Sequence, residues 1–347
     1  MLYNAIFLSL AALRMVLSSR IRMRDALYPV VLVILFVLSA FRFDVGCDWN
    51  NYFLQFEYQL EQPSAITLSG REPVWWLSIL AVQGLGLDYV WINVLSSLVF
   101  FAGIHALARR QPDRLSFLIV LFPILIINMP MSGIRQGAAI GIICFAFVAF
   151  MDRRVLRYTL LVLLASLVHS SAAIFFLLVP LVQGGYSRSR LISAVVLAAP
   201  VALMLINSEG AELAFSRYVD TGIDAGGAVF RCALLTLTGI LFFGFLNEKW
   251  RRAFLRDFKL VNLGSIYMLL NMALLPLSTV IADRLGYYFI PIQAMIFARL
   301  PFLPLRGRSF LVASPYLLLA VVFVGWTLMS RHFQFCYVPY RSWLFGI

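Results

Sequence analysis

The stretch SLVHSSAAIFF, residues 166–176, places a histidine and two serines among apolar residues, where an imidazole could act as a catalytic base. His169, followed directly by Ser170 and a second serine, interrupts a long run that is otherwise apolar. Histidine exchanges protons readily near neutral pH, so an uncharged ring there could accept the proton of an attacking hydroxyl. The structural alternative is a buried histidine that only hydrogen-bonds within the core. His105 and His332 lack such surroundings.

Three arginines at the ends of apolar runs could bind an anion. They are Arg42 in FRFDVGCDWNNY, Arg135 in NMPMSGIRQGAAIGI and Arg284 in ADRLGYYFIP. Arg135 and Gln136 would lie in the first turn of a helix, where free N–H groups and the positive dipole end favour a phosphate. Arginine also forms flat bidentate contacts with phosphate that lysine cannot form. The alternative for each is snorkelling to lipid headgroups or pairing with a nearby carboxylate.

Acids and aromatic rings alternate in FDVGCDWNNY, a pattern that suits carbohydrate. Asp48 and Tyr52 lie four residues apart, after a flexible Gly46. Rings stack on sugar faces and carboxylates accept hydrogen bonds from sugar hydroxyls, so we interpret the stretch as a sugar-binding loop. An ordinary polar loop is the alternative.

The sequence contains no HExxH, GxSxG, P-loop or Rossmann glycine pattern. Its four cysteines are too few and too scattered for a disulfide framework or a CxxC metal site. Cys47 and Cys336 fall in segments that we place on the same side and could pair, although we do not predict that disulfide. No metal site and no cofactor is expected.

The elements that would position these residues are membrane helices. Of 347 residues, 62% are hydrophobic and 13% are charged, whereas a soluble domain carries about a quarter charged residues. Apolar runs of about 18 to 22 residues recur, each long enough to cross a bilayer as a helix. The predicted fold is all-α, a polytopic membrane helix bundle forming one domain over 1–347. The spans are expected near 1–18, 26–42, 89–108, 115–131, 133–151, 189–207, 229–246, 260–277, 285–300 and 309–330.

Basic clusters predict the cytoplasmic face. They are Arg20 to Arg24, Arg109 to Arg114, Arg153 to Arg157, Arg188 to Arg190, Lys249 to Lys259, and Arg306 with Arg308. The net charge of +12 is distributed in small clusters between the spans, which argues against nucleic acid as a partner. The loops expected outside are 43–72, 208–228 and 278–284, together with the tail 331–347. Two stretches are irregular. Residues 73–87 are too short for a full crossing and are expected to be re-entrant or interfacial, and residues 155–184 are expected to form two short helices that meet at His169.

The ordered motifs resemble the EpsG/Wzy-type polysaccharide polymerases from about residue 40 to the end. The resembling residues, in chain order, are Arg42, Gly46, Asp48, Tyr52, Glu72, Arg135, Gln136, His169, Ser171, Ala172, Arg284 and Tyr288, followed by the tail YVPYRSWLF. The sequence departs from the family pattern at Cys47, where the family often has Thr or Ala, so Cys47 is not expected to take part in the chemistry.

The resemblance implies a GT-C-like fold with about 11 to 13 transmembrane or re-entrant helices and no requirement for metal. It also implies a glycosyltransferase of the bacterial inner membrane with its active site facing the periplasm. Such an enzyme joins oligosaccharide repeat units carried on undecaprenyl pyrophosphate into O-antigen or exopolysaccharide. A chain-length co-polymerase is an expected partner, and membrane lipid surrounds the protein.

The residues and the resemblance together predict a site. His169 is the expected base, with Asp48 as the alternative base or acceptor-positioning residue, and Arg135 stabilises the charge on the leaving pyrophosphate. The residues expected to bind substrate are Arg42, Tyr52, Glu72, Gln136, Ser170, Arg217, Arg284, Tyr288 and Tyr340. Two other functions remain open: a flippase or transporter of lipid-linked sugars, and a transferase like the O-antigen ligases.

Overall fold

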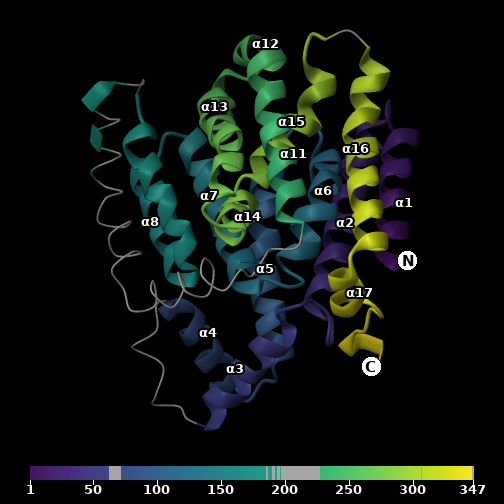
Figure 1. Ribbon diagram of the computed structural model, residues 1–347, viewed down its shortest axis with the longest axis vertical. Coiled ribbons are helices and arrows are strands. Elements are labelled where there is room, and N and C mark those ends of the chain that lie inside the picture. Colours follow the sequence, from purple (N-terminus) through teal and green to yellow (C-terminus); the bar gives the residue numbers. More distant parts are fainter. Residues whose placement is uncertain are drawn as a thin grey trace. The chain divides into compact units, whose positions relative to one another are not determined.

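The described part of the chain is entirely helical. A computed structural model describes residues 1–61, 72–184, 187–189, 192–193, 196, 227–305 and 307–345. Over these residues the chain forms fifteen α-helices and no β-strand, so the predicted all-α class is confirmed (Figure 1). One isolated antiparallel bridge joins Arg42 to Ser342.

The chain divides into two compact units, each assembled from segments that are separate in the sequence. Unit 1 comprises residues 1–144, 164–170 and 297–347, and unit 2 comprises residues 145–163 and 171–296. The helices of unit 1 are α1 (Leu2–Val16), α2 (Ile21–Ala40), α3 (Trp49–Glu61), α4 (Pro73–Gly84), α5 (Val90–Ala108), α6 (Arg114–Leu121), η1 (Phe122–Ile126), most of α7 (Ile134–Met151), the end of α8 (Val155–Val168), η6 (Leu300–Phe302), α16 (Arg308–Met329), α17 (Arg331–Tyr337) and η7 (Trp343–Phe345).

Unit 2 is built around α11, which packs against α13 and α14 (Figure 1). Its helices are most of η2 (Ser170–Leu181), α11 (Ala228–Leu241), η4 (Phe242–Leu246), α12 (Asn247–Ala253), α13 (Leu255–Leu270), η5 (Asn271–Leu274), α14 (Thr279–Tyr287) and most of α15 (Ile290–Arg299), with the end of α7 and the beginning of α8.

Within the described residues, five helices are long and apolar enough to cross a bilayer, so this is a multi-pass membrane protein. These candidate spans are Ile21–Ala40, Val90–Ala108, Ile134–Met151, Ala228–Ala253 and Phe310–Met329. Each coincides with a span predicted from the sequence. The predicted span 189–207 and the predicted loop 208–228 lie largely outside the described residues.

In unit 1, helix α2 packs on α5 and α6, while α1 packs on α16 and α6 (Figure 1). A close backbone approach fixes α7 against α5. A methyl group added at Gly103 of α5 would lie 1.9 Å from the carbonyl oxygen of Gly141 of α7. Only glycine fits there, so the two helices are held at short distance and the first turn of α7 is placed firmly.

Three segments expected as loops or tail contain helices. The loop 43–72 contains α3, the turn 278–284 is largely within α14, and the tail 331–347 contains α17. A disulfide between Cys47 and Cys336, with Cα atoms 4.7 Å apart, joins the segment before α3 to α17. We did not predict that bond. By contrast, the break at His169 is confirmed, because α8 ends at Val168 and a 3₁₀ helix begins at Ser170.

Candidate active site

Arg42 forms hydrogen bonds that hold the end of α2, the loop before α3 and the segment before α7 together. We call this set of contacts the anchor. Arg42 is fully buried, and its Nε donates to the carbonyl oxygens of Val45 at 3.0 Å and Met131 at 2.9 Å. Its two terminal nitrogens donate to the carbonyl of Ser39 at 2.7 Å and to Oδ1 of Asn93 at 3.0 Å. The guanidinium therefore ties the end of α2 to the segment that precedes α7.

The lack of a side chain at Gly46 allows the loop before α3 to pack directly against Met131, next to the anchor. The φ of this glycine is +104°, and an added Cβ would lie 1.8 Å from the carbonyl oxygen of Met131. The loop before α3 thus passes directly over the residues that lead into Arg135. Beside it, the Oγ of Ser132 donates to Oδ2 of Asp48 at 3.3 Å, and the Asp48 N–H lies 3.4 Å from the same Oγ.

An aromatic core brings α3, α4 and the start of α7 together. Its buried members are Trp49, Tyr52, Phe56, Trp75, Ile79, Val82, Tyr89, Ile92 and Ile134. Tyr52 and Trp75 pack edge to face with ring centroids 5.5 Å apart. Glu72 is the N-cap residue of α4, and Arg135 directly follows Ile134, a member of this core. The core therefore positions both charged groups in unit 1.

Glu72 is the centre of a charged cluster. Its Oε2 accepts a hydrogen bond from the Nη1 of Arg135 at 2.7 Å. Its Oε1 lies 2.5 Å from Nδ1 of His169 and accepts a bond from the backbone N–H of Ser170 at 3.1 Å. The Oγ of Ser170 lies 3.5 Å from the same oxygen. One carboxylate therefore joins the predicted base to the predicted phosphate-binding arginine.

The cluster is mostly buried, with its cation the most accessible part. The side chains of Glu72 and His169 are 10% and 12% exposed, whereas that of Arg135 is 28% exposed. The guanidinium lies over the Tyr52 ring, 5.3 Å from the centroid, and its Nε is 3.5 Å from the Tyr52 hydroxyl. This arrangement leaves part of the Arg135 guanidinium able to meet an incoming anion.

The ionisation of Glu72 determines which ring nitrogen of His169 faces it as a hydrogen-bond donor. Burial alone would raise the pKa of the Glu72 carboxyl, but the hydrogen bond and charge of His169, the charge of Arg135 and the Ser170 N–H lower it to about 2. The carboxylate is therefore ionised near neutral pH and can only accept hydrogen bonds. Nδ1 of His169 must then carry the proton, which leaves the lone pair of a neutral ring on Nε2. That nitrogen can accept a proton from a hydroxyl.

Several predicted site residues lie elsewhere. Arg42 is fully buried, and its guanidinium nitrogens are hydrogen-bonded within the anchor. The Tyr340 hydroxyl donates to the carbonyl of Leu38 at 3.0 Å, which makes this tyrosine part of the packing of the tail. Gln136 is buried in α7. Arg217 lies outside the described residues.

Two further predicted residues belong to unit 2. Arg284 lies exposed on α14, and Tyr288, fully buried, shares a hydrogen bond of 3.0 Å with the Oγ of Ser171. The prediction overlooked a bidentate pair in the same unit: Arg231 donates to the two carboxylate oxygens of Asp283 at 2.6 and 2.8 Å. An arginine within the apolar run of α11 was the available signal, because charges inside membrane helices are rarely without a partner.

One group of potential metal ligands is present among the described residues. Donor atoms of Cys47, His332 and Cys336 lie within 4.8 Å of one another. The disulfide occupies both sulfur atoms, and a metal site would need them as thiolates. The donor set therefore does not fit a resident metal in this oxidised state.

Comparison with protein families gives one result. The family model described as "EpsG family" matches residues 25–342, which include every residue of the cluster. Comparison with curated proteins and with solved structures gives no significant match.

Proposed function

Since the chain belongs to the EpsG family, which is associated with exopolysaccharide biosynthesis, we propose that it is a glycosyltransferase that polymerises lipid-linked oligosaccharide repeat units. The donor is a glycan chain on undecaprenyl pyrophosphate, and the acceptor is a hydroxyl on the terminal sugar of another lipid-linked unit. The reaction takes place on the periplasmic side of the bacterial inner membrane. The observation that carries the proposal is the contact of Glu72 with both Arg135 and His169.

The chemistry divides between the two ends of this cluster. Nε2 of His169 takes the proton of the acceptor hydroxyl as its oxygen forms a bond to the anomeric carbon. The bond from that carbon to the pyrophosphate oxygen breaks, and the electron pair stays on the phosphate. Arg135, at the start of α7 and partly exposed, stabilises this developing charge. Direct attack inverts the configuration at the anomeric carbon.

The surrounding residues suit the acceptor. Asp48 contacts Ser132, just before α7, and can accept hydrogen bonds from sugar hydroxyls, while Tyr52 packs against the Arg135 guanidinium. Because Arg135 holds the leaving group, no general acid and no metal is required, and activity should persist in EDTA.

A flippase is the competing proposal, since a cavity that moves lipid-linked sugars also needs arginine and aromatic side chains. It would not need a histidine whose Nδ1 is fixed by a carboxylate, because translocation abstracts no proton from a hydroxyl. The geometry of His169 therefore favours the transferase. A ligase-like transferase would share this chemistry and differ in its acceptor.

Purified protein with a synthetic lipid-linked repeat unit tests the proposal. Wild-type protein should extend the unit into a ladder of products, and His169→Ala should lower that rate about 10²- to 10⁴-fold. His332→Ala is the matched control, because that exposed tail histidine lies outside the cluster. Equal extension rates for wild type and His169→Ala would overturn the proposal. So would a His169→Ala variant that still extends the unit but, in proteoliposomes, no longer translocates it.

A further inference from the structure

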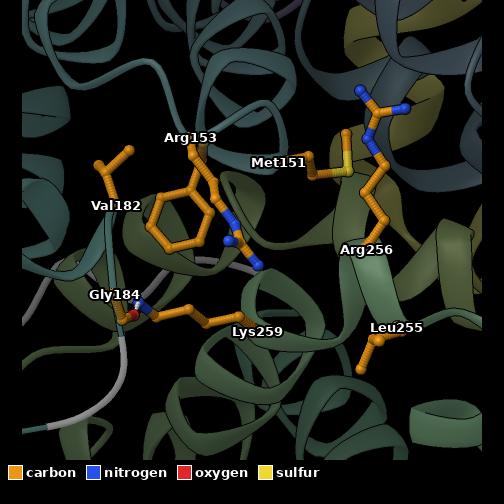
Figure 2. Close-up of a pocket in the computed structure, with 8 residues that line it drawn as sticks. Met151, Arg153, Val182, Gly184, Leu255, Arg256 and Lys259 are labelled. Carbon is orange, nitrogen blue, oxygen red and sulfur yellow. Dashed lines mark hydrogen bonds between the residues drawn. The ribbon is translucent and has the colours of Figure 1, made fainter.

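A basic cavity lies in unit 2, apart from the residues of the proposed active site. Its volume is about 310 Å³, and its lining comes from the end of α7, the end of η2 and the start of α13 (Figure 2). The lining residues are Phe150, Met151, Arg153, Val182, Gly184, Leu255, Arg256 and Lys259. Three of the eight are cationic and none is acidic.

The three lining cations differ in their partners. Lys259 donates to the backbone carbonyls of Leu181 and Gly184, the latter at 2.7 Å, and these neutral acceptors hold the ammonium in place without cancelling its charge. Arg256 pairs with Asp152. In the described part of the chain no ion pair is recorded for Arg153. Figure 2 shows Lys259 reaching to Gly184, while the Arg153 side chain extends in another direction from its own backbone.

Arg153 occupies a backbone position that favours a different residue. Its φ is +58°, in the left-handed region just after α7, where helices usually place glycine or asparagine. An arginine at such a position costs backbone strain. We interpret this strained position as one at which an arginine side chain is needed to line the cavity.

The surroundings of the cavity are those of a membrane–water boundary. Met151, in the lining, is the last residue of the candidate span Ile134–Met151. Leu255 in the lining is 72% exposed, and Leu156 and Leu160 on α8 are 73% and 55% exposed. These apolar side chains offer a surface to acyl chains, which a free phosphate ion would not use. The lining cations belong to clusters that the positive-inside rule assigns to the cytoplasmic side, where lipid surfaces are anionic.

We propose that this cavity binds the phosphate headgroup of an anionic membrane phospholipid. Arg153 contacts the phosphate oxygens, Lys259 and Arg256 add positive charge around the cavity, and the acyl chains run along the exposed leucines of α8. The site is separate from the proposed glycosyl transfer and does not depend on it.

Lipid binding to the full-length purified protein tests the proposal. Native mass spectrometry in a neutral detergent would follow titration with dioleoyl phosphatidylglycerol, dioleoyl phosphatidylcholine and inorganic phosphate. One phosphatidylglycerol should bind more tightly than phosphatidylcholine. Arg153→Asn and Arg256→Gln should each weaken that binding about fivefold, since one basic residue contributes on this order at an anionic lipid surface.

Two comparisons make the test decisive. Arg157→Gln is the matched control, because Arg157 is exposed in the same basic cluster but is not part of the lining. Arg153→Asn suits the left-handed backbone, so its thermal stability should equal or exceed that of wild type while lipid binding falls. Equal weakening by Arg157→Gln, no preference for phosphatidylglycerol, or inorganic phosphate binding as tightly as the lipid would overturn the proposal.

Discussion

Glu72 connects the two groups on which the proposed reaction depends, because each of its carboxylate oxygens serves a different partner. Oε2 faces Arg135, while Oε1 faces His169 and the backbone of Ser170. In the proposed mechanism it is a positioning residue, since it fixes the ring orientation and the tautomer of the base. The same carboxylate holds the arginine close without closing off its exposed part.

Replacing Glu72 with Gln should lower kcat of chain extension about 10²-fold or more, because the amide cannot accept hydrogen bonds from both sides as a carboxylate does. The measurement is the pH profile of kcat with the lipid-linked repeat unit. The acidic limb of that profile, where the rate rises as the base loses its proton, should change in Glu72→Gln, because the base has lost its orienting partner. An unchanged kcat and profile would contradict the positioning role.

Glu72 should also make folding stability depend on pH. Its pKa of about 2 in the folded protein lies below the usual value of 4.5, so its stabilisation is fully present above pH 4.5. This stabilisation is lost as the pH falls from about 4.5 toward 2, and it amounts to about 3 kcal/mol by linkage. Thermal unfolding in detergent at a series of pH values would measure it. The gap in Tm between wild type and Glu72→Gln should narrow over that window, and a constant gap would refute the assignment.

Arg42 should matter for stability rather than for substrate affinity. Arg42→Ala would leave buried carbonyl oxygens of Ser39, Val45 and Met131 without a donor, at a cost of about 3 kcal/mol or more. Its Tm should fall by several degrees. Arg341→Ala is the matched control, since Arg341 pairs with Asp44 on the surface and should cost under about 1 kcal/mol. An unchanged Tm for Arg42→Ala would contradict the anchor.

Which residues belong to the candidate site was easier to predict from the sequence than what each of them contacts. His169, Arg135 and Glu72 could be selected because polar groups next to apolar runs are costly and therefore informative. Their mutual contacts could not be predicted, because Glu72 and His169 are 97 residues apart and meet only through the packing of several helices. For the same reason the hydrogen bonds of Arg42 to three backbone carbonyls and to Oδ1 of Asn93 could not be predicted, because no sequence pattern reveals them.

At the scale of elements, the Cys47–Cys336 disulfide fastens the segment before α3 to α17 across 289 residues of sequence. Hydrogen bonds of the tail add to it, including Phe43 N–H to the Arg341 carbonyl at 3.0 Å and Trp343 N–H to the Phe41 carbonyl at 2.8 Å. These contacts lie next to the Arg42 anchor. The C-terminal tail therefore supports the loop that passes over the start of α7.

Cys47→Ser should destabilise the folded protein by about 2 to 5 kcal/mol, because the bond closes a very long loop in the unfolded chain. Cys336→Ser should have the same effect, and the double variant should add nothing. Tm with and without a reducing agent provides the measurement, and only wild type should respond to reduction. A double variant much less stable than either single variant would show that the sulfurs act independently.

Helices in the lipid-crossing segments could be predicted because apolar runs of span length have few alternatives. The helices α3, α14 and α17 were missed because their polar residues resemble those of loops. In α3 the signal was nevertheless present: Trp49, Tyr52 and Phe56 recur at helical spacing and are all buried. The disulfide could not be predicted, since two of four cysteines can pair in several ways and only the fold brings these two together.

At the scale of the whole molecule, the EpsG match covers residues 25–342, and the five candidate spans found in the described residues lie within or overlap that range. The proposed reaction requires a defined orientation, because its lipid-linked substrates are used on the periplasmic side. Two independent features favour that orientation. The basic clusters predict which segments stay in the cytoplasm, and a disulfide at Cys47 and Cys336 is expected on an oxidising side.

Cysteine labelling should reveal this orientation. Asn51 on α3 and Arg252 on α12 are both exposed, while the free thiols Cys144 and Cys232 are buried. In right-side-out vesicles a membrane-impermeant maleimide should label Asn51→Cys. It should label Arg252→Cys only after permeabilisation, because the basic cluster around Arg252 is predicted to face the cytoplasm. The reversed pattern would place Glu72 and His169 away from periplasmic substrates, and the proposed polymerase would then be wrong even with its site geometry intact.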